Sequence, residues 1–199
     1  MSDFFKTVRG VSQGIYKEKM SKFISFVQPV QTADEAREVV KKYQNKYHDA
    51  RHVCWAYMLG TARDQYLSSD NGEPSGTAGK PILGQINSFG LTNVVIVVVR
   101  YFGGIKLGTS GLIVAYREAA RLAIEAAEVL ECHEQAQVSF TFPYLAMNDV
   151  MRLVKREDMR VLEQAFDNVC SMTLECDADR MPAFRSQLGK VDGVSLPEA

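Results

Sequence analysis

The chain has 199 residues, of which 46% are apolar and 24% are charged, so it is long enough to bury its own hydrophobic core. Lysine and arginine total 23 against 24 acidic residues, which excludes a polycationic protein that binds nucleic acid along its whole length. No apolar run approaches the roughly 20 residues of a membrane-spanning helix, the N-terminus lacks a secretory signal, and the cysteines show no CxxC spacing. We therefore expect a cytoplasmic protein with reduced thiols and no membrane partner.

The first part of the chain alternates between strand and helix patterns, beginning with a strand predicted over 22–27. Thr32-Ala33-Asp34-Glu35 is a capping box, in which the Thr hydroxyl and the Glu carboxylate each accept a free N–H, so a helix is predicted over 33–47. Residues 94–99 are apolar at every position, which is typical of a strand covered on both sides or in the middle of a sheet. The other predicted elements are a strand over 53–59, a short helix with Pro81 in its first turn and Gly90 after its end, and a long helix with an apolar stripe of Leu112, Tyr116, Ala119, Ala123, Ala126 and Leu130.

The polar stretch 131–135 is the predicted domain boundary, which gives domains over 1–133 and 136–199. In the second part, strands are predicted over 136–142, 160–166, 169–175 and 191–196, with one helix over 148–156 and another that Asp177 caps and that ends near Gly189. This order, strand–helix–strand–strand–helix–strand, is typical of a split βαβ domain.

A glycine-rich segment over 99–111 leaves the buried strand and enters the long helix. Glycine lets backbone N–H groups approach a ligand closely, and the first turn of a helix adds free N–H groups and a partial positive charge. Such a segment can hold an anion, although its spacing is not that of a Walker A loop; the alternative is a tight corner whose glycines only permit close packing. The residues predicted to contact phosphate are Arg100, Gly103, Gly104, Lys106, Gly108 and Thr109, with Lys80 from a second glycine loop over 71–80.

Residues near these loops allow other chemistry. Asp70 and Glu73 form a carboxylate pair or a magnesium site, or are ordinary solvated turn residues, which is the favoured interpretation. His52 and Cys54 share one face of a strand, but they lack the paired cysteines of a structural zinc site and the geometry of a Cys–His nucleophile, so a packed strand with a half-buried His is expected. Tyr101 and Phe102 can supply a stacking surface for a base, although aromatic residues at the end of a strand more often belong to the core. The sequence therefore predicts no catalytic residue, no metal ligand and no cofactor.

Two motifs resemble those of a known family. The block Arg100-Tyr101-Phe102-Gly103-Gly104-Ile105-Lys106-Leu107-Gly108 resembles the signature of the IMPACT family, also called the YigZ family, and residues 71–83 resemble a second block. Residues 136–199 resemble the small C-terminal domain of bacterial members. The sequence departs from the family pattern at Ser69 and Asn71, which weakens a metal–carboxylate site at this loop.

The resemblance implies an α+β fold with two domains. The N-terminal domain is expected to be an α/β sandwich similar to a ribosomal-protein and elongation-factor module, with helices on one face of its sheet. The C-terminal domain is expected to be a ferredoxin-like split βαβ domain. Eukaryotic relatives regulate translation, which implies a non-enzymatic protein in translation control whose partner is RNA or the ribosome.

Two other functions stay open. An enzyme that acts on a small phosphorylated or nucleotide substrate would use Asp70, Glu73 and His52 as acid or base groups. A protein–protein adaptor would dock its partner at the exposed sheet edges of the C-terminal domain. No set of residues with the geometry of a known reaction can be read from the sequence, so a role in translation control through RNA or the ribosome is preferred.

Overall fold

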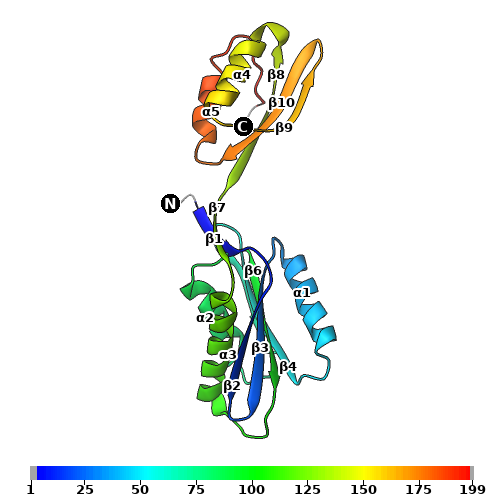
Figure 1. The fold of residues 1–199 in the computed structure, drawn as a ribbon, viewed down its shortest axis with the longest axis vertical. Coiled ribbons are helices and arrows are strands. Elements are labelled where there is room, and N and C mark those ends of the chain that lie inside the picture. The colour runs from blue at the N-terminus through cyan, green and yellow to red at the C-terminus, as the bar shows by residue number, and fades with distance from the viewer. Residues whose placement is uncertain (1–3, 198–199) are drawn as a thin grey trace. The chain divides into compact units, whose positions relative to one another are not determined.

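The computed structural model describes residues 4–197, which lie in two compact units, one over Phe4–Cys132 and one that begins at His133 (Figure 1). Each unit combines antiparallel strands with helices. The α+β fold class expected from the sequence is therefore confirmed. Of the helices in the described part of the chain, none combines the length and the apolar character needed to cross a membrane.

The first unit is built on a five-stranded antiparallel sheet with the order β2-β3-β6-β4-β5. Its central strand β6 (Val94–Tyr101) is buried along almost its whole length, as the uniformly apolar run predicts. The other strands of this sheet are β2 (Ser12–Glu18), β3 (Ser21–Pro29), β4 (His52–Leu59) and β5 (Gln65–Ser69). A separate pair is formed by β1 (Phe4–Val8) and β7 (Val129–His133).

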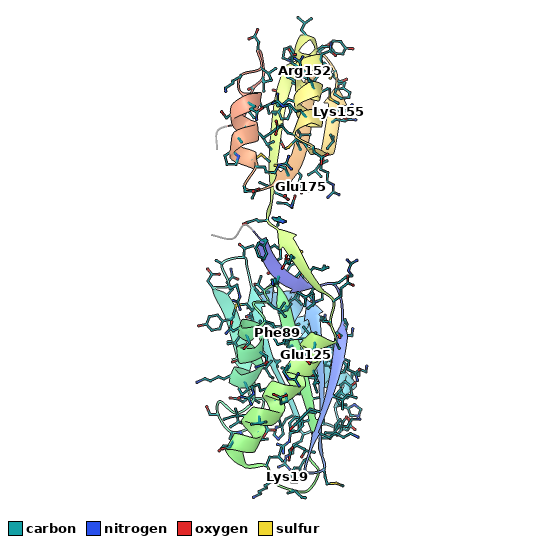
Figure 2. The ribbon with its side chains drawn as sticks, turned by 60° about the vertical axis from the view of Figure 1, so that its left-hand side comes forward. Lys19, Phe89, Glu125, Arg152, Lys155 and Glu175 are labelled. Atoms are coloured by element: carbon teal, nitrogen blue, oxygen red, sulfur yellow. The ribbon has the colours of Figure 1, made fainter. Side chains whose placement is uncertain are left out.

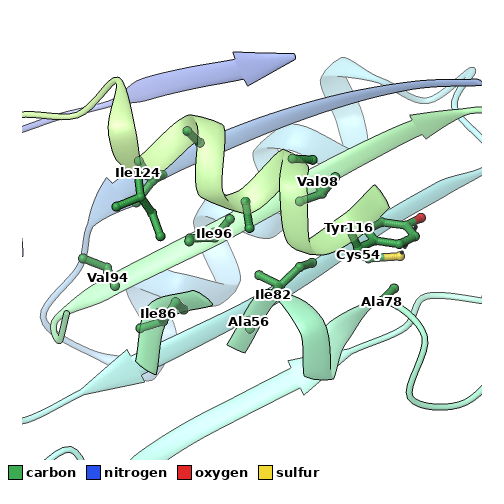
Figure 3. Packing of buried hydrophobic residues seen from close by; sticks show 14 of the residues in the cluster. Cys54, Ala56, Ala78, Ile82, Ile86, Val94, Ile96, Val98, Tyr116 and Ile124 are labelled. Atoms are coloured by element: carbon green, nitrogen blue, oxygen red, sulfur yellow. Dashed lines mark hydrogen bonds between the residues drawn. The ribbon is translucent and has the colours of Figure 1, made fainter. Parts of the chain in front are cut away.

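Helices cover both faces of this sheet, which corrects the expectation of helices on one face. Helix α1 (Ala33–Lys46) packs on one face, where alternate residues of β6 such as Val95 and Val97 belong to its core. Helices α2 (Gly79–Ser88) and α3 (Gly108–Glu125) pack on the other face, over Ile96 and Val98 (Figure 3). A strand with apolar side chains on both faces needs cover on both, and α1 supplies the second layer.

Local sequence signals explain which elements were predictable. The capping box of α1 forms, since Thr32 Oγ1 accepts the Glu35 N–H at 3.2 Å and Glu35 Oε2 accepts the Gln31 N–H at 2.7 Å. The hydrophobic pattern does not predict β1, β2, β5 or β7. These strands lie at sheet edges or in the separate pair and expose much of their side-chain surface. Because few of their side chains are buried, their sequences show little alternation between apolar and polar residues.

The second unit has a three-stranded sheet with the order β8-β10-β9, in which both pairs are antiparallel. This is the ferredoxin-like split βαβ arrangement that the sequence predicts. The predicted last strand over 191–196 is wrong in extent, since it is reduced to one bridge between Ser195 and Thr141. The elements are β8 (Gln135–Pro143), a single 3-10 turn (Tyr144–Ala146), α4 (Met147–Arg156), β9 (Arg160–Phe166), β10 (Val169–Asp177) and α5 (Met181–Leu188).

The start of α5 and the edge strand β9 bear on two features predicted for this unit. Asp177 does not cap α5; its carboxylate accepts a hydrogen bond from Gln135 Nε2 at 2.6 Å, and α5 begins after Arg180 without a side-chain cap. Strand β9 is a free sheet edge, and all of its residues are exposed. A free sheet edge of this kind has unpaired backbone groups that can pair with an added strand.

Candidate functional site

The two glycine loops of the sequence meet at one pocket of the first unit. Residues from the start of β4, the loop over 71–80, the end of β6 and the start of α3 line a cavity of about 400 Å³. Of the predicted phosphate-binding residues, the cavity is lined by Arg100, Lys106, Gly108 and Thr109. It is also lined by His52, Glu73, Phe102 and Arg51. The sheet thus brings together residues that are far apart in the chain.

Asp70 organises the loop rather than facing solvent, so its interpretation as a solvated turn residue is wrong. Its carboxylate accepts the backbone N–H groups of Gly76 at 2.8 Å, Ala78 at 3.0 Å and Gly79 at 2.8 Å. The last of these residues is the first of α2, so Asp70 satisfies N–H groups that the helix start leaves free. Burial by itself would raise the pKa of Asp70, but these three N–H groups and the charge of Lys80 outweigh it and lower the pKa.

The lowered pKa of Asp70 predicts a pH-dependent contribution to stability. We expect Asp70→Asn to reduce the free energy of unfolding by about 1.5–3 kcal/mol at pH 7, the range for hydrogen bonds to a charged acceptor. A carboxylate with a lowered folded pKa stabilises fully above its unfolded pKa, and this contribution is lost as the pH falls through the folded pKa. Urea unfolding at pH 7 and pH 3 should therefore show a smaller difference between the two proteins at pH 3. An equal difference at both values would contradict this role.

Glu73 is buried in an ion pair, which also contradicts its interpretation as a solvated residue. Its Oε1 accepts hydrogen bonds from Arg100 Nη1 at 2.6 Å and from the Tyr116 hydroxyl at 2.8 Å. The side chains of Glu73 and Arg100 are only 4% and 7% exposed. The Arg100 guanidinium also lies 5.6 Å from the ring centroids of Phe23 and Phe102. Glu73 thereby neutralises much of the charge that Arg100 would offer an anion.

Cys54 and Tyr116 lie side by side (Figure 3), and the Tyr116 hydroxyl donates to Glu73 of this ion pair. The Cys54 thiol is 3.3 Å from the Tyr116 hydroxyl and donates to the Asp70 carbonyl oxygen at 2.9 Å. Burial raises the pKa of Cys54 to about 12, so the group stays a protonated thiol at neutral pH. A thiol that is buried and protonated is not a nucleophile, and the expected packed strand fits this position.

Positive groups surround the open part of the pocket. Helix α3 begins after Leu107 without a side-chain cap, and Gly108 and Thr109 of its first turn line the cavity. Lys106 and Arg51 also line it, and neither is within 4 Å of a carboxylate oxygen in residues 4–197. Sequence reasoning missed Arg51, although a basic residue directly before a strand that ends at the pocket was a usable signal.

The remaining predicted phosphate-binding residues do not line the pocket. Gly103 donates its N–H to Ser21 Oγ at 3.2 Å, and a Cβ at this position would lie 2.0 Å from the carbonyl carbon of Met20. Close packing against the β2–β3 hairpin therefore explains this glycine. Gly104 has a φ of +88°, a conformation that favours glycine. Lys80 lies at the start of α2, where its charge acts on Asp70.

Comparison with known proteins identifies the family. The Impact N-terminal domain matches residues 19–124. The chain belongs to the IMPACT family. An IMPACT family member of Haemophilus influenzae is 34% identical over 172 residues, which cover 85% of this chain and 84% of the relative. The family member YigZ of Escherichia coli is 29% identical over 180 residues, which cover 89% of this chain and 88% of the relative.

A solved structure extends the likeness to the fold of the whole chain. The crystal structure of a hypothetical protein matches with a TM-score of 0.75 at 25% identity, and the match covers 100% of this chain and 98% of that one. All residues that line the pocket fall within the range that matches the Impact N-terminal domain. The pocket is therefore a feature of the part of the chain that carries the IMPACT family motifs.

Proposed function

We propose that the pocket binds phosphate groups of single-stranded RNA, and that the protein acts in translation control through RNA or the ribosome without catalysing a reaction. The observation that carries this proposal is the uncapped start of α3, which meets Arg51 and Lys106 in one cavity. Free N–H groups at a helix start, with a partial charge of about +0.5, favour an anion. The Thr109 hydroxyl adds a further donor.

An exposed aromatic ring at the pocket favours a nucleotide chain over a bare phosphate. Phe102 is 43% exposed, and one of its faces is covered by the Arg100 guanidinium. Stacking of a base on an aromatic ring contributes about 1–3 kcal/mol and tolerates any base sequence. A ring beside a phosphate site is the combination that proteins use for single-stranded nucleic acids.

Lysines outside the pocket lie on the β2–β3 hairpin, where Lys22 shares its sheet face with Ile24 rather than with Phe23 and Arg100. Lys17 and Lys22 face each other across β2 and β3, and neither is within 4 Å of a carboxylate oxygen in the described residues. Lys19 lies at the turn of the same hairpin (Figure 2). Like charges directly opposite each other destabilise a strand pair, so a bound polyanion would relieve the repulsion between Lys17 and Lys22.

The cellular role rests on the family. Membership of the IMPACT family fits a role in translation regulation. Contact with RNA is the step that we add, and it would connect the pocket to that role.

The alternative of an enzyme for a small phosphorylated substrate has weaker support. Asp70 is occupied by three backbone N–H groups, and Cys54 is a buried, protonated thiol. One oxygen of Glu73 is held by Arg100 and Tyr116. Most of the groups that such an enzyme would use are therefore already engaged within the fold.

The test of the proposal is the salt dependence of RNA binding. A fluorescein-labelled oligouridine of 12 nucleotides is titrated with the full-length protein at several salt concentrations, and binding is followed by anisotropy. Each phosphate contact contributes about 0.7 to the slope of log affinity against log salt for a single strand. We expect Lys106→Gln and Arg51→Gln each to weaken binding and to flatten the slope by about this amount.

A matched control separates the pocket from general charge. Lys41→Gln removes the same charge from an exposed position on α1 and should leave both affinity and slope unchanged. If Lys41→Gln and Lys106→Gln weakened RNA binding equally, the effect would indicate only long-range attraction between the charge of the protein and the RNA. Unchanged binding in both pocket variants would contradict the site, and the absence of any binding at low salt would contradict the proposed function.

A further inference from the structure

The pocket contains two hydrogen-bond acceptors that no described residue uses. Oε1 of Glu73 is occupied by Arg100 and Tyr116, whereas Oε2 accepts no hydrogen bond from residues 4–197. His52 Nε2 lies 3.9 Å from Oε2, which is beyond hydrogen-bond distance. Glu73 lines the pocket, and its side chain is only 4% exposed.

The orientation of His52 places a second acceptor beside this oxygen. His52 Nδ1 lies 2.9 Å from the carbonyl oxygen of Asn71. A carbonyl can only accept, so Nδ1 carries a hydrogen, and in the neutral imidazole Nε2 is then an acceptor. Nε2 of His52 and Oε2 of Glu73 thus present two acceptors to the same space, in a pocket where Glu73 is the one carboxylate among the described lining residues.

We infer that this pair binds the 2′-hydroxyl of a ribose and lets the pocket select RNA over DNA. The inference rests on the proposed function, because it concerns the same pocket. A nucleotide in the pocket has its sugar between the phosphate, which fits the α3 start and Lys106, and the base, which fits Phe102. The sugar must then provide the donor for the unused acceptors, and the 2′-hydroxyl is the donor that distinguishes ribose from deoxyribose.

The first experiment compares three labelled probes of 12 nucleotides on the full-length protein: oligouridine, oligo-deoxyuridine and 2′-fluoro-oligouridine. All three have the same bases and charge. The fluoro probe keeps a polar substituent at the 2′ position but cannot donate a hydrogen bond. We expect oligouridine to bind at least about tenfold more tightly than either of the others, as for the loss of one hydrogen bond to a charged acceptor.

The substitution Glu73→Gln tests whether the selectivity for RNA over DNA depends on the two acceptors of Glu73 and His52. Glu73→Gln keeps an oxygen for Arg100 and Tyr116 but places an NH2 group toward His52, which removes both free acceptors. We expect the RNA-to-DNA affinity ratio of Glu73→Gln to fall toward 1 while DNA binding is retained. His52→Phe, which leaves the buried ion pair intact, should lower the same ratio and serves if Glu73→Gln does not fold.

The outcomes separate this inference from the proposed function. Equal affinity of the wild-type protein for oligouridine and 2′-fluoro-oligouridine would overturn ribose recognition while leaving phosphate binding in place. A ratio that survives in both variants would also overturn it. No binding of any probe at low salt would overturn the proposed function, and ribose recognition with it.

Discussion

Arg100→Ala is expected to lower the free energy of unfolding of the first unit by about 3–5 kcal/mol, the cost of removing one partner of a buried ion pair. Without the guanidinium, the Glu73 carboxylate would lose its ion-pair partner in a site where its side chain is 4% exposed. The packing of Arg100 against Phe23 and Phe102 would be lost as well. Urea unfolding followed by the fluorescence of Trp55 measures the effect, since this is the single tryptophan and lies in β4 of the same unit.

The reason for this loss can be tested with a second substitution. Adding Glu73→Gln to Arg100→Ala removes the stranded charge and keeps an acceptor for the Tyr116 hydroxyl. The double variant should therefore be more stable than Arg100→Ala alone. A cost below about 1 kcal/mol for Arg100→Ala, or a double variant that is less stable than the single one, would show that burial of this pair contributes little.

Gly103→Ala is expected to cost about 3 kcal/mol, the upper part of the range for overpacking a tightly packed site. The added Cβ would lie 2.0 Å from the carbonyl carbon of Met20 and 2.4 Å from the Ser21 nitrogen. Both atoms belong to the backbone, so no side-chain rotation removes the clash and the β2–β3 hairpin must shift. The shift would also break the hydrogen bond from the Gly103 N–H to Ser21 Oγ. Trp55 fluorescence in urea again reports the loss.

Gly84→Ala is the matched control for this substitution. Gly84 lies within α2, and a Cβ there would have no heavy atom within 4 Å. Alanine has the higher helix propensity, so this variant should be as stable as the wild type or more stable by up to about 1 kcal/mol. Gly103→Ala within about 0.5 kcal/mol of wild type would contradict the packing role of this glycine.

These two predictions change how the RNA proposal has to be tested. Arg100 and Gly103 belong to the segment that the sequence predicts to be a phosphate site. In the structure, however, Arg100 forms a buried ion pair with Glu73, and Gly103 packs against the β2–β3 hairpin. A loss of RNA binding in Arg100→Ala could result either from unfolding of the protein or from loss of a contact with RNA, and the binding assay alone would not distinguish the two. Lys106 and Arg51 are the better probes, because no carboxylate of the described residues pairs with them within 4 Å.

Local patterns in the sequence were sufficient for much of the fold. The uniformly apolar run of β6 predicts a strand with two buried faces, and the capping box at Thr32 predicts where α1 begins. The order of the first five elements of the second unit, from β8 to α5, also follows from periodicity and turn residues. Each of these signals depends on residues within a few positions of one another, so the chain carries it before any tertiary contact forms.

The family motifs likewise belong to the sequence alone. They marked the loops over 71–80 and 99–111 as the informative parts of the chain, and both loops reach the pocket. What these motifs could not show is the task of each residue within them. Glu73 is buried in an ion pair, Gly103 allows the β2–β3 hairpin to pack closely and Lys106 lines the pocket, although all three lie in segments of similar composition.

Only the tertiary structure decided these tasks, because they depend on partners that are distant in the chain. Glu73 meets Arg100 across 27 residues and Tyr116 across 43. These contacts exist because the β4–β6 register sets His52 opposite Arg100 and because α3 packs over the same end of the sheet. A one-residue shift of that register would turn every side chain of the strand to the other face. The sequence thus determined the helices, the buried strands and the loops that matter, and the sheet register determined which of their side chains are buried partners and which remain free to bind a ligand.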